Sequence, residues 1–295
     1  TILNNIDKVP YITFKSLENI PWLKCGFSTR LGGVSKGIFS TMNMSFTRGD
    51  VEADVRENIR LFSEAAGFNG ENIVMPHQCH TTNVRIVGKG DRGGGVIKPG
   101  CIDEIDGQIT NDENTVLYCM GADCVPVFIV DVEKRVVAAC HAGWKGTVNN
   151  IVKAAVEKMV SKFGCDPKNM KAVIGPSICM DCYEVSEDVA KRFIDAYNTV
   201  DKNTVANTDS GIKKENIHPV VRPASGDFND NPTGKYFLNL WEANKIDLIN
   251  AGLDSHAIEI SGYCTRCHPD LLFSHRYHGE KRGVNIGYIF IEKQI

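Results

Sequence analysis

The sequence of 295 residues has no apolar run approaching the roughly 18 residues that a membrane-spanning helix needs. It has no block of basic residues either, and its formal net charge is −3. Proteins that bind nucleic acids usually carry a basic patch, so that class is not expected. Residues 1–7 lack the basic and apolar pattern of a secretory signal. We therefore expect a cytoplasmic protein that binds neither membranes nor nucleic acids.

Internal repeats and low-complexity tracts are also absent, and the composition is 42% apolar and 23% charged, as in ordinary globular proteins. Short apolar runs separated by turns, with amphipathic helices between them, indicate an α/β or α+β chain. Residues 200–214 and 219–234 are polar or rich in Pro, Gly and Asn. This composition predicts inserted loops instead of domain boundaries.

The eleven cysteines are numerous and odd in number. Without a secretory signal they indicate reduced thiols and metal ligands, not a disulfide framework. Two Cys-x-x-Cys pairs, Cys179/Cys182 and Cys264/Cys267, are typical of zinc sites. More than 80 residues separate the pairs, which disfavours a local zinc ribbon. Buried reduced thiols are the favoured interpretation, and a second metal site formed by tertiary contact stays open.

Residues 136–147 carry the strongest signal for a functional site. An apolar, β-branched run predicts a buried strand, and Gly143 and Gly146 interrupt it. Apolar residues then recur at helical spacing from Ile151 to Phe163, and Gly164 predicts the end of that helix. His141 is therefore expected where a strand meets a helix, whose free N–H groups favour an anion.

Other potential ligands lie earlier in the chain. Cys124 precedes the apolar residues 125–130, and two histidines and a cysteine occur within residues 77–80. Two imidazoles and one thiolate form a three-ligand zinc set that leaves a fourth position for water or substrate. Each residue alone is also compatible with an ordinary core or surface position. The spacing of these residues does not decide between a zinc site and ordinary positions, because they lie too far apart in the sequence for a zinc-finger pattern.

Six ordered motifs resemble the YfiH-type family. They comprise residues 77–80, 106–110, 122–127, 141–146, 175–178 with 182–185, and 264–265 with 273–276. That family was first described as multicopper polyphenol oxidase (laccase-like) and is now understood as purine nucleoside phosphorylase with adenosine deaminase activity. The resemblance runs from about residue 26 to the C-terminus. It implies one YfiH-like domain over residues 1–295, of mixed α+β class, with layered mixed sheets flanked by helices.

The resemblance also implies a metal centre. The family's Gln-x-His pattern selects His80, with His77 as second choice, and the other ligands are Cys124 and His141. Zinc is the expected metal, with copper as the alternative. These three residues and Asp123 are the expected catalytic groups. Asp123 would hold a ligand or carry a proton, although an Asp there is also typical of a turn or helix cap.

Four residues are expected to bind substrate or phosphate: Arg30, Asn43, Lys145 and Arg276. Arg30 matches the family's Arg-x-Gly-Gly-Val-Ser signature, and an Arg before two glycines presents its planar fork to an anion, unless it is paired structurally or solvated. Ser40 and Asn43 match a family element in which a small residue is followed, three residues later, by Asn. Lys145 opens the helical segment after His141. Arg276 matches the first arginine of a family motif at residues 273–279, from which Tyr277 and His278 depart.

We therefore expect a zinc-dependent purine nucleoside phosphorylase with adenosine deaminase activity. Its partners would be a purine nucleoside and phosphate, and the chain would be a monomer or small homo-oligomer. Three alternatives stay open. The first is a copper-dependent phenol oxidase, although eight dispersed histidines are few for multicopper chemistry. The second is a cysteine hydrolase with Cys124 as nucleophile and His141 as base. The third is a structural zinc with His77 or Cys79 as a fourth ligand.

Overall fold

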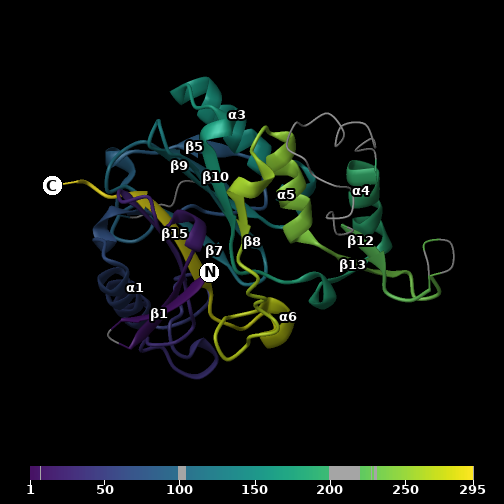
Figure 1. Ribbon diagram of the computed structural model, residues 1–295. Coiled ribbons are helices and arrows are strands. Elements are labelled where there is room, and N and C mark those ends of the chain that lie inside the picture. Colours follow the sequence, from purple (N-terminus) through teal and green to yellow (C-terminus); the bar gives the residue numbers. More distant parts are fainter. Residues whose placement is uncertain (7, 99–103, 199–219, 227, 229–230, 295) are drawn as a thin grey trace.

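The computed structural model describes residues 1–6, 8–98, 104–198, 220–226, 228 and 231–294. Its strands form two six-stranded sheets and one three-stranded sheet (Figure 1). The first sheet is ordered β1 (Ile2–Ile6), β2 (Val9–Thr13), β3 (Leu23–Ser28), β15 (Asn285–Ile291), β7 (Val116–Gly121) and β4 (Ile73–Val74). The second is ordered β14 (Ile258–Ile260), β10 (Met170–Ile174), β8 (Val125–Asp131), β9 (Val136–Ala142), β6 (Gly107–Thr110) and β5 (Val84–Ile86). The third is ordered β11 (Glu184–Ser186), β13 (Lys235–Leu238) and β12 (Val221–Pro223).

The helices lie between these strands in the chain. The α-helices are α1 (Glu52–Ala66), α2 (Trp144–Val148), α3 (Ile151–Phe163), α4 (Glu187–Asn198), α5 (Leu240–Asn250) and α6 (His275–His278). Short 3-10 turns are η1 (Lys15–Leu17), η2 (Gly37–Phe39), η3 (Gly70–Asn72), η4 (Lys89–Asp91), η5 (Pro167–Asn169), η6 (Met180–Cys182) and η8 (Ser255–Ala257).

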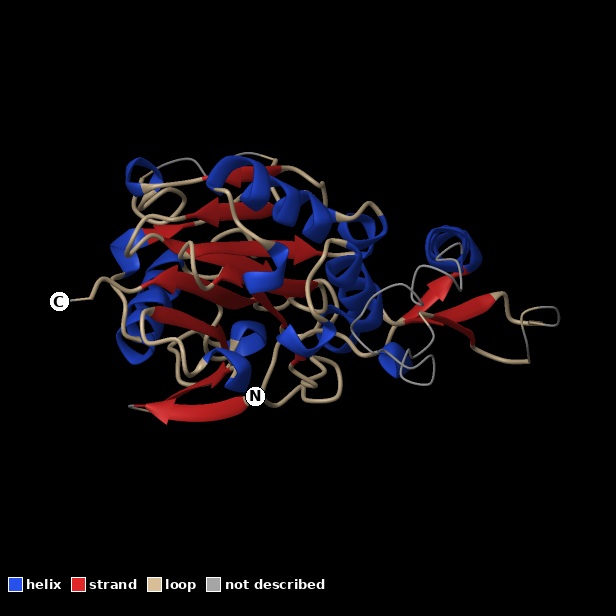
Figure 2. Cartoon of the chain, turned by 45° about the horizontal axis from the view of Figure 1, so that its top comes forward, coloured by secondary structure: helices blue, strands red, loops and turns tan. Residues whose placement is uncertain are grey.

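The two large sheets pack face to face, and helices cover their outer faces (Figure 2). Between the sheets, Phe27 and Leu117 of the first sheet share a core with Phe128 and Val137 of the second. Helix α1 packs on the other face of the first sheet, while α3 and α5 pack on the other face of the second. Both sheets contain parallel and antiparallel pairs. The predicted α+β class, with mixed sheets flanked by helices, is confirmed.

Strands β8 and β9 are buried at every position because both faces of their sheet are covered. Alternate side chains point to opposite faces of a strand. In β9, Ala138 and Cys140 accordingly enter the core beneath the helices, and Val137 and Ala139 enter the core between the sheets. His141 shares the parity of Val137 and Ala139, so the fold turns its side chain toward the first sheet.

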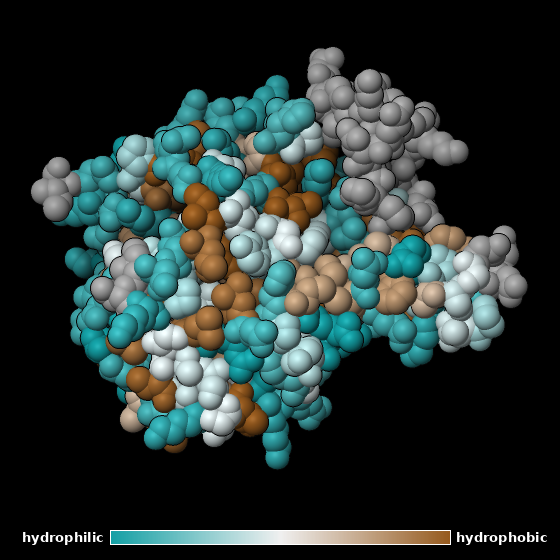
Figure 3. All heavy atoms as spheres, turned by 60° about the horizontal axis from the view of Figure 1, so that its bottom comes forward, coloured by the Kyte–Doolittle hydropathy of each residue, from teal (hydrophilic) through white to brown (hydrophobic). Residues whose placement is uncertain are grey.

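The three-stranded sheet and α4 project from the two-sheet body (Figure 2). The predicted loop at residues 200–214 lies outside the described residues. The second predicted loop, residues 219–234, contains β12, which pairs with β13. Figure 3 shows a face that is largely hydrophilic, with apolar residues in narrow strips. None of the helices in the described part of the chain is both long and apolar enough to span a membrane.

The segment around His141 differs in one respect from its prediction. The strand and the helix of residues 151–163 are present, and Gly164 ends α3 in the left-handed conformation at φ 64°. However, the five-residue α2 starts at Trp144, and Asn150 (φ 62°) separates it from α3. Helix α3 therefore begins at Ile151 and not directly after Gly146, and the expected binding of an anion at a helix N-terminus here stays a prediction.

Candidate active site

Three of the predicted ligands converge at one edge of the second sheet. The potential ligand atoms of His80, Cys124 and His141 all lie within 4.8 Å of one another. Cys124 precedes β8, and His141 is the last residue but one of β9. These strands are antiparallel neighbours that pair Pro126 with His141. His80 reaches the same point from the loop between β4 and β5. Its Nε2 lies 3.7 Å from the Cys124 Sγ, and its ring stands 76° to the His141 ring.

Asp106 fixes two of these residues. Its Oδ1 accepts hydrogen bonds from His141 Nδ1 at 2.7 Å and from the His80 backbone N–H at 3.0 Å. Its Oδ2 accepts from the Thr81 N–H, the Thr81 hydroxyl and the Cys79 N–H. Because an ionised carboxylate only accepts, His141 Nδ1 carries the proton and Nε2 is left for a ligand. Asp106 lies in the motif at residues 106–110 that resembles the family, but the sequence did not indicate its role at the metal centre.

The same contacts set the charges of the site. Burial acts to raise the pKa of Asp106, but hydrogen bonds from His141 and Thr81 outweigh it and lower the value to about 2. Burial also acts to raise the pKa of Cys124, yet the nearby His141 and His80 lower it to about 6. For His141, burial is outweighed by Cys124 and Asp106, which raise its pKa to about 9. Cys124 therefore has strong thiolate character, the form that binds metals.

Asp123 lies beside this cluster, and its carboxylate is engaged by other loops. Its Oδ1 accepts from the Thr265 hydroxyl at 2.6 Å, and its Oδ2 accepts from the Arg276 N–H at 2.7 Å. Its carbonyl accepts from the Ile178 N–H, and its φ is 98°. These contacts are those of a turn residue that joins three loops. Its role as a proton carrier stays a prediction.

A cavity of about 780 Å³ opens over the three ligands. This volume lies in the range of small-molecule sites, roughly 300–1,000 Å³. All three ligands and Asp123 line it. The apolar and aromatic part of the wall includes Phe46, Met75, Trp144, Ile178 and Tyr183, and the charged part includes Arg48, Arg276, Glu280 and Arg282.

Of the four residues predicted to bind substrate or phosphate, Arg276 lines this cavity. The Arg30 guanidinium donates to the carbonyls of Ser40 and Pro269 and lies 4.7 Å from the Phe273 ring centre.

Asn43 is buried, where its amide donates to Asp50 and to the carbonyl of Ser45. The Lys145 ammonium lies 5.6 Å from the Trp144 ring centre. Arg30, Asn43 and Lys145 are not among the residues that line the cavity in the described part of the chain, and their assigned roles stay predictions.

Two further arginines line the cavity, Arg48 and Arg282, and the sequence did not point to either of them. Arg282 is 7% exposed, and its Nη1 donates to the carbonyls of Gly279 and Glu280. Its buried Nε has no partner. Burial lowers the pKa of Arg282 most, and the positive charge of Arg48 lowers it further. Two cations close together beside an unsatisfied donor form an environment that favours an anion. Their sequence carried little signal for anion binding, because both residues lie outside the six motifs that resemble the family.

Comparison with known proteins places the chain in a family. Residues 24–292 match the family described as multi-copper polyphenol oxidoreductase laccase. Purine nucleoside phosphorylase YlmD of Bacillus subtilis (strain 168) is 34% identical over 90% of this chain and 87% of its own length. Adenosine deaminase RL5, from an unknown prokaryotic organism, is 31% identical over 94% of each protein. The crystal structure of YlmD from Geobacillus stearothermophilus superposes with a TM-score of 0.84 at 28% identity and covers 99% of both chains. The chain therefore belongs to the multi-copper polyphenol oxidoreductase laccase family, the YfiH-type family that its motifs resemble, whose relatives include proteins named purine nucleoside phosphorylase and adenosine deaminase.

Proposed function

We propose that the protein is a zinc-dependent purine nucleoside phosphorylase that also deaminates adenosine. The observation that carries this proposal is the convergence of His80, Cys124 and His141 on the wall of a nucleoside-sized cavity. The names of the relatives support the same two activities. Both reactions act on one nucleoside, phosphorolysis at the glycosidic bond and deamination at the purine ring, so one cavity suits both.

The donor set fits zinc. Two imidazoles and a thiolate are common zinc ligands, and three protein ligands leave an open position, as in catalytic sites. Gly143 leaves the space they need, because a Cβ there would lie 2.6 Å from His80 Cδ2 and 3.2 Å from Cys124 Sγ. His77 and Cys79 do not join the group among the described residues, which disfavours a closed structural site. The other potential metal cluster in that part of the chain has four cysteines and no imidazole, unlike a multicopper centre.

A bound zinc ion would supply Lewis acidity, which polarises a ligand and lowers the pKa of water. The protein supplies the rest. Asp106 keeps His141 in one tautomer, and the apolar wall at Trp144, Ile178 and Tyr183 would bind the purine. Asp123 would move the proton, and Glu280 is a second carboxylate on the same wall.

The arginines of the wall would hold phosphate. Arg282 is buried with an unpaired Nε, so binding an oxyanion would satisfy a donor that the fold leaves without a partner. Arg48 and Arg276 line the same cavity. Their fixed charges would place phosphate beside the ribose and stabilise charge that develops during glycosidic cleavage.

Product analysis tests the proposal. Protein of verified metal content is incubated with inosine, guanosine or adenosine, with and without phosphate, and the products are separated by chromatography. We expect free base and ribose 1-phosphate only with phosphate, and inosine from adenosine without it. Absence of both conversions in zinc-loaded protein would contradict the proposal.

A cysteine hydrolase is the second candidate, and the lowered pKa of Cys124 beside His141 favours it. A thiol reagent separates the two roles. If Cys124 is a zinc ligand, it should be modified only after zinc is removed; a nucleophile should react in the protein as purified.

A further inference from the structure

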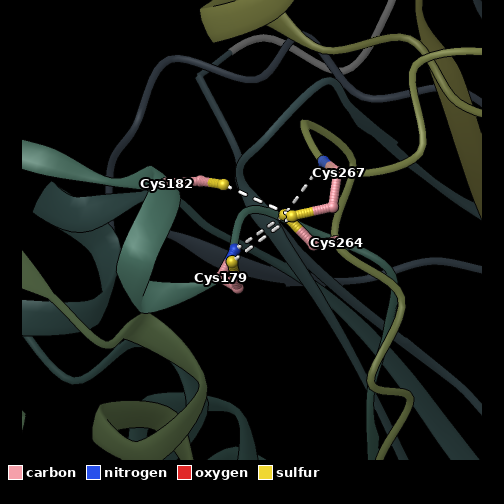
Figure 4. A group of neighbouring side chains, drawn as sticks. All are labelled: Cys179, Cys182, Cys264 and Cys267. Atoms are coloured by element: carbon pink, nitrogen blue, oxygen red, sulfur yellow. Dashed lines mark hydrogen bonds between the residues drawn. The ribbon is translucent and has the colours of Figure 1, made fainter.

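Four cysteines outside the cavity wall converge on one point. The sulfurs of Cys179, Cys182, Cys264 and Cys267 all lie within 4.8 Å of one another. Figure 4 shows these side chains turned toward a common centre from two separate loops. Cys182 Sγ lies 3.4 Å from Cys267 Sγ, and Cys179 Sγ lies 4.0 Å from the same atom.

The sheet explains why residues so far apart in sequence meet. Cys179 and Cys182 follow β10, and Cys264 and Cys267 follow β14, which is the parallel neighbour of β10. Parallel strands deliver their following loops to the same edge of a sheet. Hydrogen bonds continue past the strand ends, from the Ser177 N–H to the Tyr263 carbonyl and from the Thr265 N–H to the Ser177 carbonyl, both 3.1 Å.

The exposure of the four residues contradicts the expectation of buried thiols. Cys264 is buried, but Cys179 and Cys182 are only half-buried and Cys267 is exposed. Burial of apolar thiols therefore does not explain the cluster. Disulfides do not explain it either, since a bonded pair of sulfurs is about 2.05 Å apart.

A single tetrahedral metal ion fits the distances. Four sulfurs at about 2.3 Å from zinc are separated by about 3.8 Å along the edges of the tetrahedron. The observed separations of 3.4 and 4.0 Å lie on either side of this value. An iron–sulfur cluster holds several iron and sulfide atoms and would need its cysteines further apart.

The surroundings favour thiolates. Cys264 Sγ accepts backbone hydrogen bonds from Cys179 at 3.3 Å and from Cys267 at 3.4 Å. Such N–H groups stabilise the charged form of a sulfur. Arg266, between two of the cysteines in the sequence, adds a positive charge beside the cluster.

We propose that Cys179, Cys182, Cys264 and Cys267 bind one zinc ion in a closed structural site, distinct from the centre in the cavity. Four thiolates fill a tetrahedral shell and leave no position for substrate. The two loops that this ion joins also form part of the cavity, through Ile178 and Tyr183 on one loop and the Thr265–Asp123 hydrogen bond on the other. The ion would thus hold one wall of the cavity in place.

Metal analysis of two sets of variants tests this site separately from the proposed function. With both sites filled, purified protein should carry about two zinc ions per chain. His80→Ala should remove one and Cys267→Ser the other, while Cys165→Ser, a cysteine outside both clusters, should remove neither. X-ray absorption of the His80→Ala protein should then show four sulfurs at about 2.3 Å.

A conservative variant guards against a folding defect. Cys267 is exposed, and Cys267→His offers another zinc ligand, so it should retain the metal that Cys267→Ser loses. It should also restore the unfolding temperature that the Ser variant lowers. Iron in place of zinc, two disulfides by thiol titration, or unchanged zinc content in Cys267→Ser would each overturn the proposal.

Discussion

Asp106 is the residue on which the metal centre depends most. One buried carboxylate accepts hydrogen bonds from His141 Nδ1 and from the backbone of His80, so it orients two ligands at once. Partners of this kind fix the tautomer and direction of a metal-binding histidine. The residue lies more than 25 positions from His80 and His141, and its donors include backbone N–H groups that no side-chain pattern reveals.

Replacing this carboxylate should weaken the metal centre. Asp106→Asn presents an amide N–H₂ to donors that need an acceptor, so zinc affinity at the His80 site should fall about 10- to 100-fold. Competition with a chromophoric chelator measures the change. Asp112→Asn is the matched control, because Asp112 also accepts a backbone N–H, from Lys89. Equal affinities in the Asp106 variant and the wild type would remove Asp106 from the account.

The arginines of the wall should separate the two reactions. Arg282→Gln or Arg48→Gln should reduce phosphorolysis of inosine at limiting phosphate by roughly ten- to a hundredfold, the effect of losing a charge-assisted hydrogen bond of about 1.5–3 kcal/mol. Deamination of adenosine needs no phosphate and should change much less. The variant Arg85→Gln, at an exposed ion pair, should leave both rates unchanged.

The same assay assigns the arginines predicted from sequence. Arg276→Ala should behave like the wall variants. Arg30→Ala should mainly lower the unfolding temperature, since the Arg30 guanidinium donates to the carbonyls of Ser40 and Pro269. A phosphate KM unchanged in all the wall variants would place the anion elsewhere.

At the scale of elements, one contact between helices predicts a pH dependence. Asp247 on α5 is 3% exposed, and its Oδ2 accepts a hydrogen bond from the Tyr197 hydroxyl of α4 at 2.8 Å. Burial raises the pKa of Asp247 to about 7. Its ordinary value is 3.8, so the stability it contributes is complete below about pH 4 and is lost as the pH rises to about 7.

Asp247→Asn should remove this dependence, because the amide resembles the protonated acid. Relative to the wild type, the free energy of unfolding of the variant should rise by up to about 4 kcal/mol between pH 4 and pH 7. Above pH 7 the difference between the two proteins should stay constant. Urea unfolding across this range measures it. Glu157→Gln, at an exposed carboxylate of α3, is the control. A difference that does not vary with pH would show that Asp247 is ionised in the folded state.

Periodicity predicted the elements with one clear buried face, and tertiary contacts changed their ends. Apolar residues at helical spacing predict a helix that Asp50 caps and Gly67 ends. Helix α1 does end before Gly67, but it begins at Glu52, and the Asp50 carboxylate instead accepts hydrogen bonds from Ser35 and Asn43. Helical periodicity over residues 237–251 predicts a helix that starts at Phe237. Helix α5 begins at Leu240, since Phe237 belongs to β13, which pairs with β11 and β12. Local spacing does not encode such pairings.

At the scale of the whole molecule, sheet topology assembles both clusters of potential ligands. The antiparallel pair β8–β9 brings Cys124 beside His141, and the parallel pair β10–β14 brings the Cys-x-x-Cys loops together. The first set was predictable because its motifs resemble those of a family. The second was not, because no local pattern reveals which strands become parallel neighbours, and spacing alone favoured isolated thiols.

The central claim is that one site, formed by His80, Cys124 and His141, holds the metal on which both activities depend. The most direct test measures zinc content, inosine phosphorolysis and adenosine deamination together in His80→Ala, Cys124→Ala and His141→Ala. Each variant should contain about one zinc ion per chain less than the wild type and should lose both activities, because any two ligands bind zinc far more weakly than three. Wild-type zinc content together with undiminished turnover in any one of the three would contradict the claim.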